Sequence, residues 1–347
     1  MLLVIPGCAT TLSTRAQHEY HALDMARRAL GDTKHPKHVC VTAWGISATS
    51  QREAENDARA QIVSQIRSRI EVVSTDVAGS ISRDGIVIDS QFVNRSIRIA
   101  AKFDRNELIR IDDELSSGFP AGVYRAFAYA SRDEIARQLD SEYSDAAVVF
   151  RSQAEHSRTL EQDVVAFAQA FHAASSAFSR MLDAACGHLA VTGIPVPGFE
   201  ADCGLRRTLE RSRADLVAGM RIAVSLAADP RIDTRALADA VASAIIGLGV
   251  RASTADCVEV GSLRLELQAE IEWNTLAGVR YCKARLSGNL ESCPDGVALA
   301  PVLLAGGPLE GRGRDPVDNL RRRATAEALK PLVHKALAPF IPFAQSE

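Results

Sequence analysis

The chain has 347 residues, of which 47% are hydrophobic and 24% are charged, so it can fold into two or three domains with buried cores. Forty basic residues against 43 acidic ones give a net charge of -3, which argues against a nucleic-acid-binding protein. No run of 18 apolar residues occurs, so no transmembrane helix is predicted.

The first eight residues, Met-Leu-Leu-Val-Ile-Pro-Gly-Cys, form an apolar run that ends in a small residue and a cysteine. This run resembles the lipobox of a bacterial lipoprotein signal, with Ile5 to Cys8 at the lipobox positions. The resemblance implies that residues 1–8 are a partial signal, that Cys8 carries lipid, and, with alanine at position 9, that the outer membrane is the destination. The run is short and lacks a basic leader, so the alternative is an N-terminal strand with a chance cysteine.

The next part of the chain predicts an N-terminal α/β domain over residues 39–130. Residues 9–38 are polar and are expected to form a tether that is helical from Gln17 to Leu30. A strand is predicted over 39–46, and Ser50 with Glu53 forms a capping box that starts a helix over about 50–72. Further strands are predicted near 86–102 and 122–130. The apolar residues of that helix recur every four positions and predict one buried stripe: Ala54, Ala58, Ile62, Ile66 and Ile70.

A second capping box, Ser131 with Glu134, opens a long helical segment over 131–192. Its length exceeds that of an ordinary globular helix, so a helical hairpin or spacer is predicted. The Pro- and Gly-rich stretch that follows predicts a linker over 193–202. A C-terminal α/β domain is expected over 203–341, with a strand near 220–226 and a helix over 234–248 capped by Asp233.

Residues 263–273 alternate between apolar and polar side chains, which is typical of a strand with one buried face. We expect it to turn at 274–278 and to pair with the following strand so that 271 faces 282 and 269 faces 284. A shorter hairpin that turns at Ser287-Gly288 is the alternative.

The cysteines suggest an oxidising compartment, because six remain when Cys8 is set aside. One predicted disulfide joins Cys186 to Cys203 across the loop between them. Another joins Cys257 to Cys293 at the open end of the hairpin, whereas the shorter hairpin would pair Cys282 with Cys293. The alternative is that all six are small buried side chains.

Two glycine-containing segments repeat the same pattern of a strand end followed by a capped helix. Gly45, Ala54 and Ala58 correspond to Gly311, Leu320 and Ala324. The sequence thus predicts an α+β fold with two small α/β modules, each an antiparallel sheet with packed helices, joined by a long helical segment.

The segments Thr42-Ala-Trp-Gly-Ile-Ser, Glu53-Ala-Glu-Asn-Asp-Ala-Arg-Ala and Tyr124-Arg-Ala-Phe-Ala-Tyr-Ala-Ser resemble the Lpp-twenty family of bacterial outer-membrane lipoproteins. The N-terminal domain of the flagellar outer-membrane ring protein FlgT is similar. The resemblance covers about residues 38–135 and implies a compact α/β domain without known catalytic residues. Family members commonly carry a lipobox, in agreement with Cys8.

Two His-x-x-His pairs, His18 with His21 and His35 with His38, are candidate metal ligands because neutral imidazole binds zinc, copper or nickel. A solvated polar segment is the favoured interpretation, so no metal or other cofactor is expected. No catalytic motif is found, and we expect no enzyme activity.

These patterns predict a lipid-anchored periplasmic envelope protein with a structural, scaffold or adaptor role at the outer membrane. Its expected partners are outer-membrane lipid, through Cys8, and an envelope protein or peptidoglycan. The alternative is a soluble periplasmic accessory or regulatory protein that binds a peptidoglycan enzyme or a small ligand.

Overall fold

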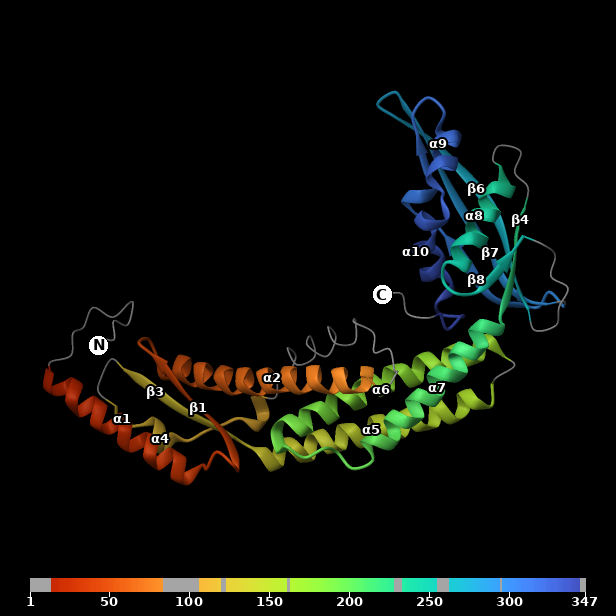
Figure 1. Ribbon diagram of the computed structural model, residues 1–347. Helices are drawn as coiled ribbons and strands as arrows, with labels where there is room; N and C mark the ends of the chain where they lie inside the picture. The colour runs from red at the N-terminus through yellow and green to blue at the C-terminus, as the bar shows by residue number, and fades with distance from the viewer. Residues whose placement is uncertain are drawn as a thin grey trace. The chain divides into compact units, whose positions relative to one another are not determined.

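The computed structural model divides the chain into two compact units, each containing helices and a sheet (Figure 1). Unit 1 comprises Met1–Ala147 and Phe178–Glu200, and unit 2 comprises Val148–Ala177 and Ala201–Glu347. The predicted α+β class is confirmed. The structure describes residues 14–83, 106–119, 123–160, 163–227, 233–254, 262–293 and 295–343.

Unit 1 is built on a three-stranded antiparallel sheet with the order β1-β3-β2. Gly45 of β1 faces Ala126 of β3 in the centre of this sheet. Its elements are α1 (Thr14–Lys34), β1 (Cys40–Ser47), α2 (Gln51–Arg83), a 3-10 turn (Asn106–Leu108), β2 (Arg110–Ile111), α4 (Asp113–Ser116) and β3 (Tyr124–Ser131).

One face of this sheet presents small side chains to α2. Ala43, Ala126 and Ala128 are buried there against the stripe of α2, whose residues Ala54, Ala58, Ile62, Ile66 and Ile70 are all buried as predicted. Helix α2 begins where predicted, because the Glu53 amide donates to the Ser50 hydroxyl at 3.2 Å and so caps the helix. Helix α2 runs to Arg83, about three turns beyond its predicted end. The strands predicted near 86–102 lie outside the described residues.

The other face of the sheet carries aromatic side chains and meets α1 and α4. Phe127 lies 4.9 Å from Trp44 and 5.4 Å from His35, measured between ring centroids. A Cβ added to Gly31 of α1 would lie 3.1 Å from the Phe127 ring. The helix predicted from Gln17 to Leu30 is present within α1. It packs on the sheet rather than forming a free tether, because Gly31 lets α1 approach the Phe127 ring closely. Residues 9–13 lie outside the described residues.

The long helical segment is a helical hairpin, as predicted, formed by α5 (Arg132–Arg158) and α6 (Val164–Thr192). Both helices contribute residues to both units. The predicted linker over 193–202 is shorter than expected, because a further helix, α7 (Phe199–Gly219), begins inside it. The buried residues of α7 are spread among charged ones, so the sequence shows no strong apolar stripe that would predict this helix.

None of the helices described is both long enough and apolar enough to cross a membrane.

Unit 2 contains a mixed sheet rather than the predicted antiparallel one, with the order β5-β4-β6-β7-β8 and with β9 beside β7. Strand β4 is parallel to β5 and β6, because β4 returns to β5 through helix α8 and a helical crossover produces parallel neighbours. Its elements are β4 (Arg221–Leu226), α8 (Thr234–Ile246), β5 (Arg251–Ser253), β6 (Leu263–Leu276), β7 (Val279–Ser292), β8 (Ala298–Leu304), η2 (Gly307–Leu309), β9 (Glu310–Arg312), α9 (Pro316–Arg323) and α10 (Ala326–Leu337).

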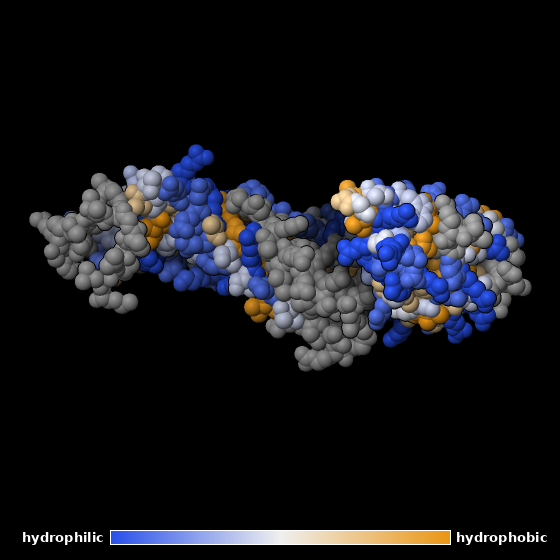
Figure 2. Space-filling view, turned by 90° about the horizontal axis from the view of Figure 1, so that it is seen from above, coloured by the Kyte–Doolittle hydropathy of each residue, from blue (hydrophilic) through white to orange (hydrophobic). Residues whose placement is uncertain are grey.

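Helices α8, α9 and α10 cover one face of this sheet and enclose the core of unit 2 (Figure 1). Leu265, Leu267 and Leu286 point from the strands into that core and are completely buried. Asp233 caps α8 as predicted, since its carboxylate accepts from the Ala236 amide at 3.1 Å. The described surface seen from above is mainly hydrophilic, with hydrophobic residues in scattered patches (Figure 2).

The long β6–β7 hairpin is present, but its turn is tighter than predicted. Leu276 pairs with Val279, so 271 faces 284 rather than 282, and 269 faces 286. Ala277 and Gly278 both have positive φ, +48° and +78°, which is the geometry of a two-residue turn that matches strand twist. The observed pairing of β6 with β7 is shifted by two residues from the predicted one. Because side chains alternate along a strand, this shift leaves the same side chains facing the core, and Cys282 is buried as expected.

Candidate functional site

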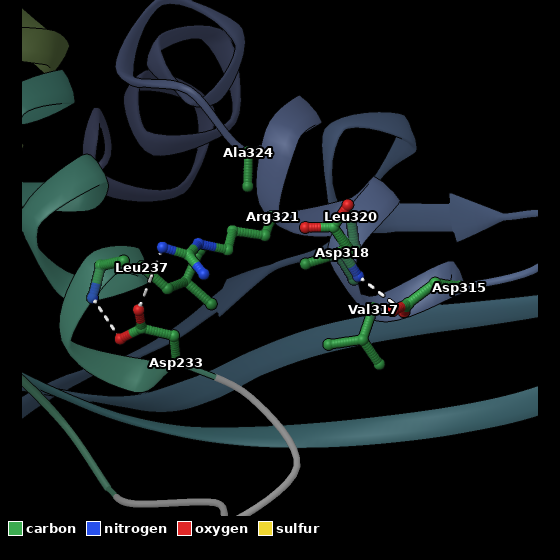
Figure 3. Close-up of a pocket in the computed structure, with 9 residues that line it drawn as sticks. Asp233, Leu237, Asp315, Val317, Asp318, Leu320, Arg321 and Ala324 are labelled. Atoms are coloured by element: carbon green, nitrogen blue, oxygen red, sulfur yellow. Dashed lines mark hydrogen bonds and ion pairs between the residues drawn. The ribbon is translucent and has the colours of Figure 1, made fainter.

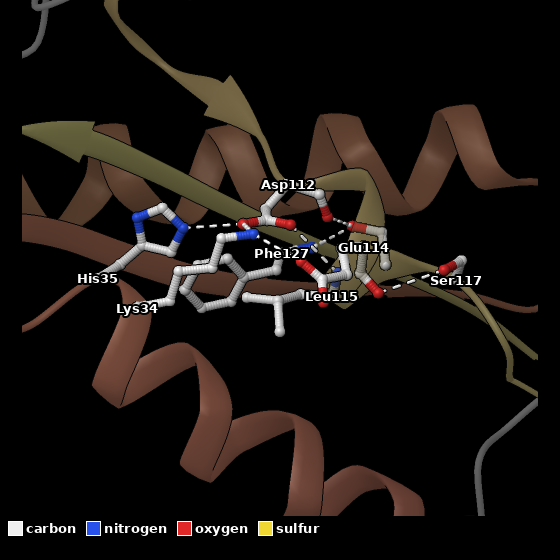
Figure 4. A network of polar contacts seen from close by, with 8 residues as sticks. Lys34, His35, Asp112, Glu114, Leu115, Ser117 and Phe127 are labelled. Atoms are coloured by element: carbon white, nitrogen blue, oxygen red, sulfur yellow. Dashed lines mark hydrogen bonds and ion pairs between the residues drawn. The ribbon is translucent and has the colours of Figure 1, made fainter.

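A buried carboxylate joins the end of α1 to α4 on the aromatic face of unit 1 (Figure 4). Asp112 precedes α4 and caps it, because one carboxylate oxygen accepts from the Leu115 amide at 3.2 Å. The other oxygen lies 2.8 Å from Nε2 of His35 and 2.9 Å from Nζ of Lys34. Lys34 also reaches Glu114 at 2.9 Å. The network ties the end of α1 to α4.

The pKa of Asp112 reflects a balance of burial and hydrogen bonding. Burial alone would raise this pKa, but hydrogen bonds from His35, Lys34 and the Leu115 amide lower it to about 2. The same contacts with Glu114 and Asp112 raise the pKa of Lys34. The His35 ring is stacked on Tyr129 at 3.9 Å. Both oxygens of Asp112 are thus used for hydrogen bonds within unit 1, and the network is suited to holding α1 in place.

A second buried charge, Arg125 of β3, contacts α1 nearer its N-terminus. Its side chain is 5% exposed, and its Nη2 lies 3.1 Å from the Asp24 carboxylate. Its Nε donates to the Tyr20 hydroxyl at 2.7 Å, and its guanidinium lies over the rings of Tyr20 and Phe119. Helix α1 is therefore held by two charged contacts along its length, and neither was anticipated from the sequence.

A signal for Arg125 was present in the sequence. In the strand Tyr124-Arg-Ala-Phe-Ala-Tyr, residues 125, 127 and 129 share one face, because side chains alternate along a strand. An arginine on the same strand face as two aromatic residues indicates a charge that needs a buried partner. Asp24 could not be identified as that partner, because α1 lies about a hundred residues earlier in the chain.

A cavity of about 340 Å³ lies in unit 2 between the start of α8 and α9 (Figure 3). Asp233 and Asp315 line it, and each caps its helix through a backbone amide at 3.1 Å. Arg321 reaches across toward Asp233, with 3.7 Å between nitrogen and oxygen. Leu237 and Val317 contribute apolar lining. The cavity combines an apolar wall with a rim of three carboxylates, of which Asp233 lies near Arg321 and Asp318 near Arg322.

The candidate metal ligands are not brought together. His18 and His21 lie on α1, and His21 is exposed. Fourteen residues of helix separate His21 from His35, which is about 21 Å along the axis. His35 is committed to Asp112, and His38 is exposed. No group of three His, Cys, Asp or Glu side chains within the described ranges is arranged to hold a metal ion.

The cysteines depart in part from the predicted pairing. Cys186 in α6 and Cys203 in α7 are buried thiols, so the disulfide predicted between them is not formed. Because the two helices follow each other through a short turn, their packing already closes the loop without a covalent link. The alternative pairing of Cys282 with Cys293 is also wrong, since Cys282 is a buried thiol.

Cys293 itself is disulfide-bonded. Its predicted partner, Cys257, lies outside the described residues. Cys8, the predicted lipidation site, lies outside them as well.

No protein-family model matches the chain. No curated protein matches it either. Among solved structures, the chain is similar to the secreted protein HP1454 from the human pathogen Helicobacter pylori, with 12% sequence identity and a TM-score of 0.35. The similarity covers 86% of this chain and 98% of that chain. A likeness of this size assigns neither a fold nor a function.

Proposed function

We propose that the protein is a lipid-anchored periplasmic protein with a scaffold or adaptor role at the outer membrane, attached through Cys8. The observation that carries the proposal is the run Leu-Leu-Val-Ile-Pro-Gly-Cys, which resembles a lipobox. The resemblance of residues 38–135 to the Lpp-twenty family supports it, because members of that family commonly carry such an anchor. The role is non-catalytic.

The way α1 is held supports a close attachment to the membrane. Only residues 9–13 separate Cys8 from the first residue of α1, Thr14. An extended chain of that length reaches at most about 20 Å. Because Asp112 and Arg125 fix α1 to the sheet of unit 1, a lipid on Cys8 would hold that unit near the headgroups. Such an arrangement suits a scaffold that presents its surface at a defined distance from the bilayer.

Metabolic labelling with palmitate tests the anchor. The wild-type chain is expected to take up label and to fractionate with the outer membrane, and Cys8→Ser is expected to lose both properties. Cys40→Ala is the matched control, because Cys40 is a buried thiol that no anchor requires. Equal labelling of Cys8→Ser, or an intact mass showing residues 1–7 still attached to a chain in the cytosol, would contradict the proposal.

A second candidate is a soluble periplasmic accessory or regulatory protein that binds a small ligand or a peptidoglycan enzyme. The cavity between α8 and α9 favours this function, because Asp233, Asp315 and Asp318 give it an acidic rim. Spermidine is a suitable cationic probe, and its binding would raise the melting temperature of the wild-type chain. Asp318→Asn should reduce that rise, because it removes a rim charge without removing a helix cap. An unchanged melting temperature at millimolar spermidine would count against this function.

A further inference from the structure

The end of the β6–β7 hairpin in unit 2 is exposed on both of its faces. Every residue from Glu272 to Arg280 is exposed, although the same strands are buried nearer their other ends. Three of these residues are large and apolar, with exposed fractions of 49% for Trp273, 66% for Leu276 and 40% for Val279. Leu276 and Val279 pair across the turn on one face, and Trp273 pairs with Cys282 on the other. The hairpin therefore extends past the core and ends in apolar side chains.

Residues of this kind are unusual at the end of a hairpin. Turns in soluble proteins are ordinarily polar, and contiguous exposed apolar residues mark a surface that contacts something else. The core of unit 2 does not require them, because the buried row of β6 is complete at Leu267 and its later members are only partly covered. The exposed apolar side chains are therefore available for a contact outside unit 2.

Past Glu272, which lies 3.7 Å from Arg285, the charges at the turn are positive. Residues 273–282 and the neighbouring residues 311–314 contain three arginines and no carboxylate. Strand β9 brings them together, since Arg312 pairs with Tyr281 and the Gly313 amide donates to the Arg280 carbonyl at 3.0 Å. All three arginines are exposed, and none of them forms an ion pair within the part of the chain that the structure describes: Arg280, Arg312 and Arg314.

Two basic side chains farther from the turn lie near carboxylates. Lys283 lies 3.4 Å from Glu310, and Arg285 lies 3.7 Å from Glu272. The end of the hairpin thus carries three arginines without an ion pair among the described residues, beside the exposed apolar side chains.

We propose that this hairpin tip, defined as Trp273, Leu276, Val279, Arg280, Arg312 and Arg314, inserts into the headgroup region of an anionic phospholipid bilayer. Indole and phenol rings favour the boundary between headgroups and acyl chains, and arginine is attracted to negative lipid surfaces. The contact is non-covalent and goes beyond the proposed scaffold function, because it does not depend on Cys8.

Two other occupants fit the tip less well. A second copy of the chain placed tip to tip would bring the three arginines of each copy together, and the nearest carboxylate, Glu272, already contacts Arg285 of its own hairpin. A stable protein partner ordinarily covers about 800 Å² on each side, which three apolar side chains at a narrow turn cannot supply. Binding to a bilayer does not require a surface of complementary shape. A small apolar tip with neighbouring cationic side chains is therefore sufficient for membrane binding.

The test uses the full chain without its lipid anchor and with a single tryptophan. The chain has two tryptophans, so Trp44→Phe leaves Trp273 as the sole emitter, and Cys8→Ser removes acylation. With vesicles of phosphatidylglycerol and phosphatidylcholine in equal parts, the Trp273 emission is expected to shift to shorter wavelength. With phosphatidylcholine alone, no shift is expected. Binding should weaken as salt is raised, because exposed charges are screened.

Two sets of variants separate the apolar and the charged contributions. In this background, Leu276→Asn with Val279→Asn should weaken vesicle partitioning by at least about tenfold, since both side chains would enter the bilayer. Arg280→Gln should weaken it by about fivefold. The matched controls are Leu303→Asn on β8, where the leucine is 54% exposed, and Arg251→Gln on β5, and both should leave partitioning unchanged.

The proposal is overturned if Trp273 emission does not respond to anionic vesicles, or if Leu303→Asn costs as much binding as the tip variants. Concentration-dependent dimerisation that Leu276→Asn abolishes would also overturn it and would identify a second copy as the occupant. Because the tested chain carries no acyl group, neither result bears on lipidation of Cys8.

Discussion

Two charged side chains of unit 1, Asp112 and Arg125, are almost fully buried, and both bind α1. Removing one partner of a buried ion pair leaves the other charge without compensation, which costs about 3–5 kcal/mol. The Asp112 carboxylate is compensated by hydrogen bonds from His35, Lys34 and the Leu115 amide. Arg125 is compensated by Asp24 and by the Tyr20 hydroxyl. The position of α1 is therefore determined by contacts with Asp112 and with β3.

Asp112→Asn tests the first of these contacts through its pH dependence. The pKa of Asp112 is about 2 in the folded chain against an ordinary value of 3.8, so its contribution is present above about pH 4 and is lost as the pH falls toward 2. That contribution is about 2 kcal/mol. The variant should be less stable at neutral pH and should lose this part of the acid sensitivity, as measured by urea unfolding at several pH values.

Glu114→Gln is the control for that measurement. Its carboxylate is 64% exposed and contacts Lys34 at the surface, so the change should alter stability by less than about 1 kcal/mol. An Asp112→Asn curve that runs parallel to the wild-type curve across the acid range would refute the assignment.

The correspondence between the two glycine-containing segments has a structural counterpart. In unit 1, a Cβ added to Gly45 would lie 1.9 Å from the carbonyl oxygen of Ala54 in α2. In unit 2, a Cβ added to Gly311 would lie 1.8 Å from the carbonyl oxygen of Pro316 in α9. In each unit a strand thus lies against the backbone of the helix that follows it, which only glycine permits.

Gly45→Ala and Gly311→Ala should each destabilise the protein by about 3 kcal/mol or more, because the atoms that would clash belong to helix backbone and cannot rotate away. Urea unfolding measures the loss. Gly204→Ala is the matched control, since nothing lies within 4 Å of its added Cβ in α7, and alanine there should be neutral or stabilising. If Gly45→Ala unfolds at the wild-type midpoint, the close approach of α2 to β1 is wrong.

At the scale of the whole molecule, the described cysteines differ in oxidation state. Cys293 is disulfide-bonded, whereas Cys40, Cys186, Cys203 and Cys282 are buried thiols. Burial raises the pKa of both Cys40 and Cys282, which keeps them in the unreactive thiol form. Cys293 is itself only 6% exposed, so the described part of the chain holds one buried oxidised cysteine beside four protected thiols.

Alkylation of the native, purified protein with iodoacetamide tests this distribution by peptide mapping. The four buried thiols should react only after denaturation, and Cys293 should react only after reduction. We expect the peptide that carries Cys293 to be linked to the one that carries Cys257. Rapid labelling of Cys40 or Cys282 under native conditions would contradict their burial, and a link between Cys186 and Cys203 would restore the pairing expected from the sequence.

Much of the secondary structure was predictable where the pattern was local. The fourfold spacing from Ala54 to Ile70, the Asp233 cap and the alternation in β6 all correspond to elements of the structure. Helix α7 was missed, because its few buried residues lie among charged ones and leave no clear period. The exact turn of the hairpin was also missed, because a two-residue shift preserves the alternation and so leaves the sequence pattern unchanged.

The sequence by itself determined the α+β composition, the buried stripe of α2 and the inward face of the hairpin, since each depends on spacing between near neighbours. Tertiary structure alone decided that α1 packs on the sheet, that Asp112 and Arg125 hold it there, and that β9 brings Arg312 beside the end of the β6–β7 hairpin. These contacts join residues far apart in the chain. Which charges become partners depends on how the helices and strands pack in three dimensions. The spacing of residues along the sequence does not show which distant residues come into contact.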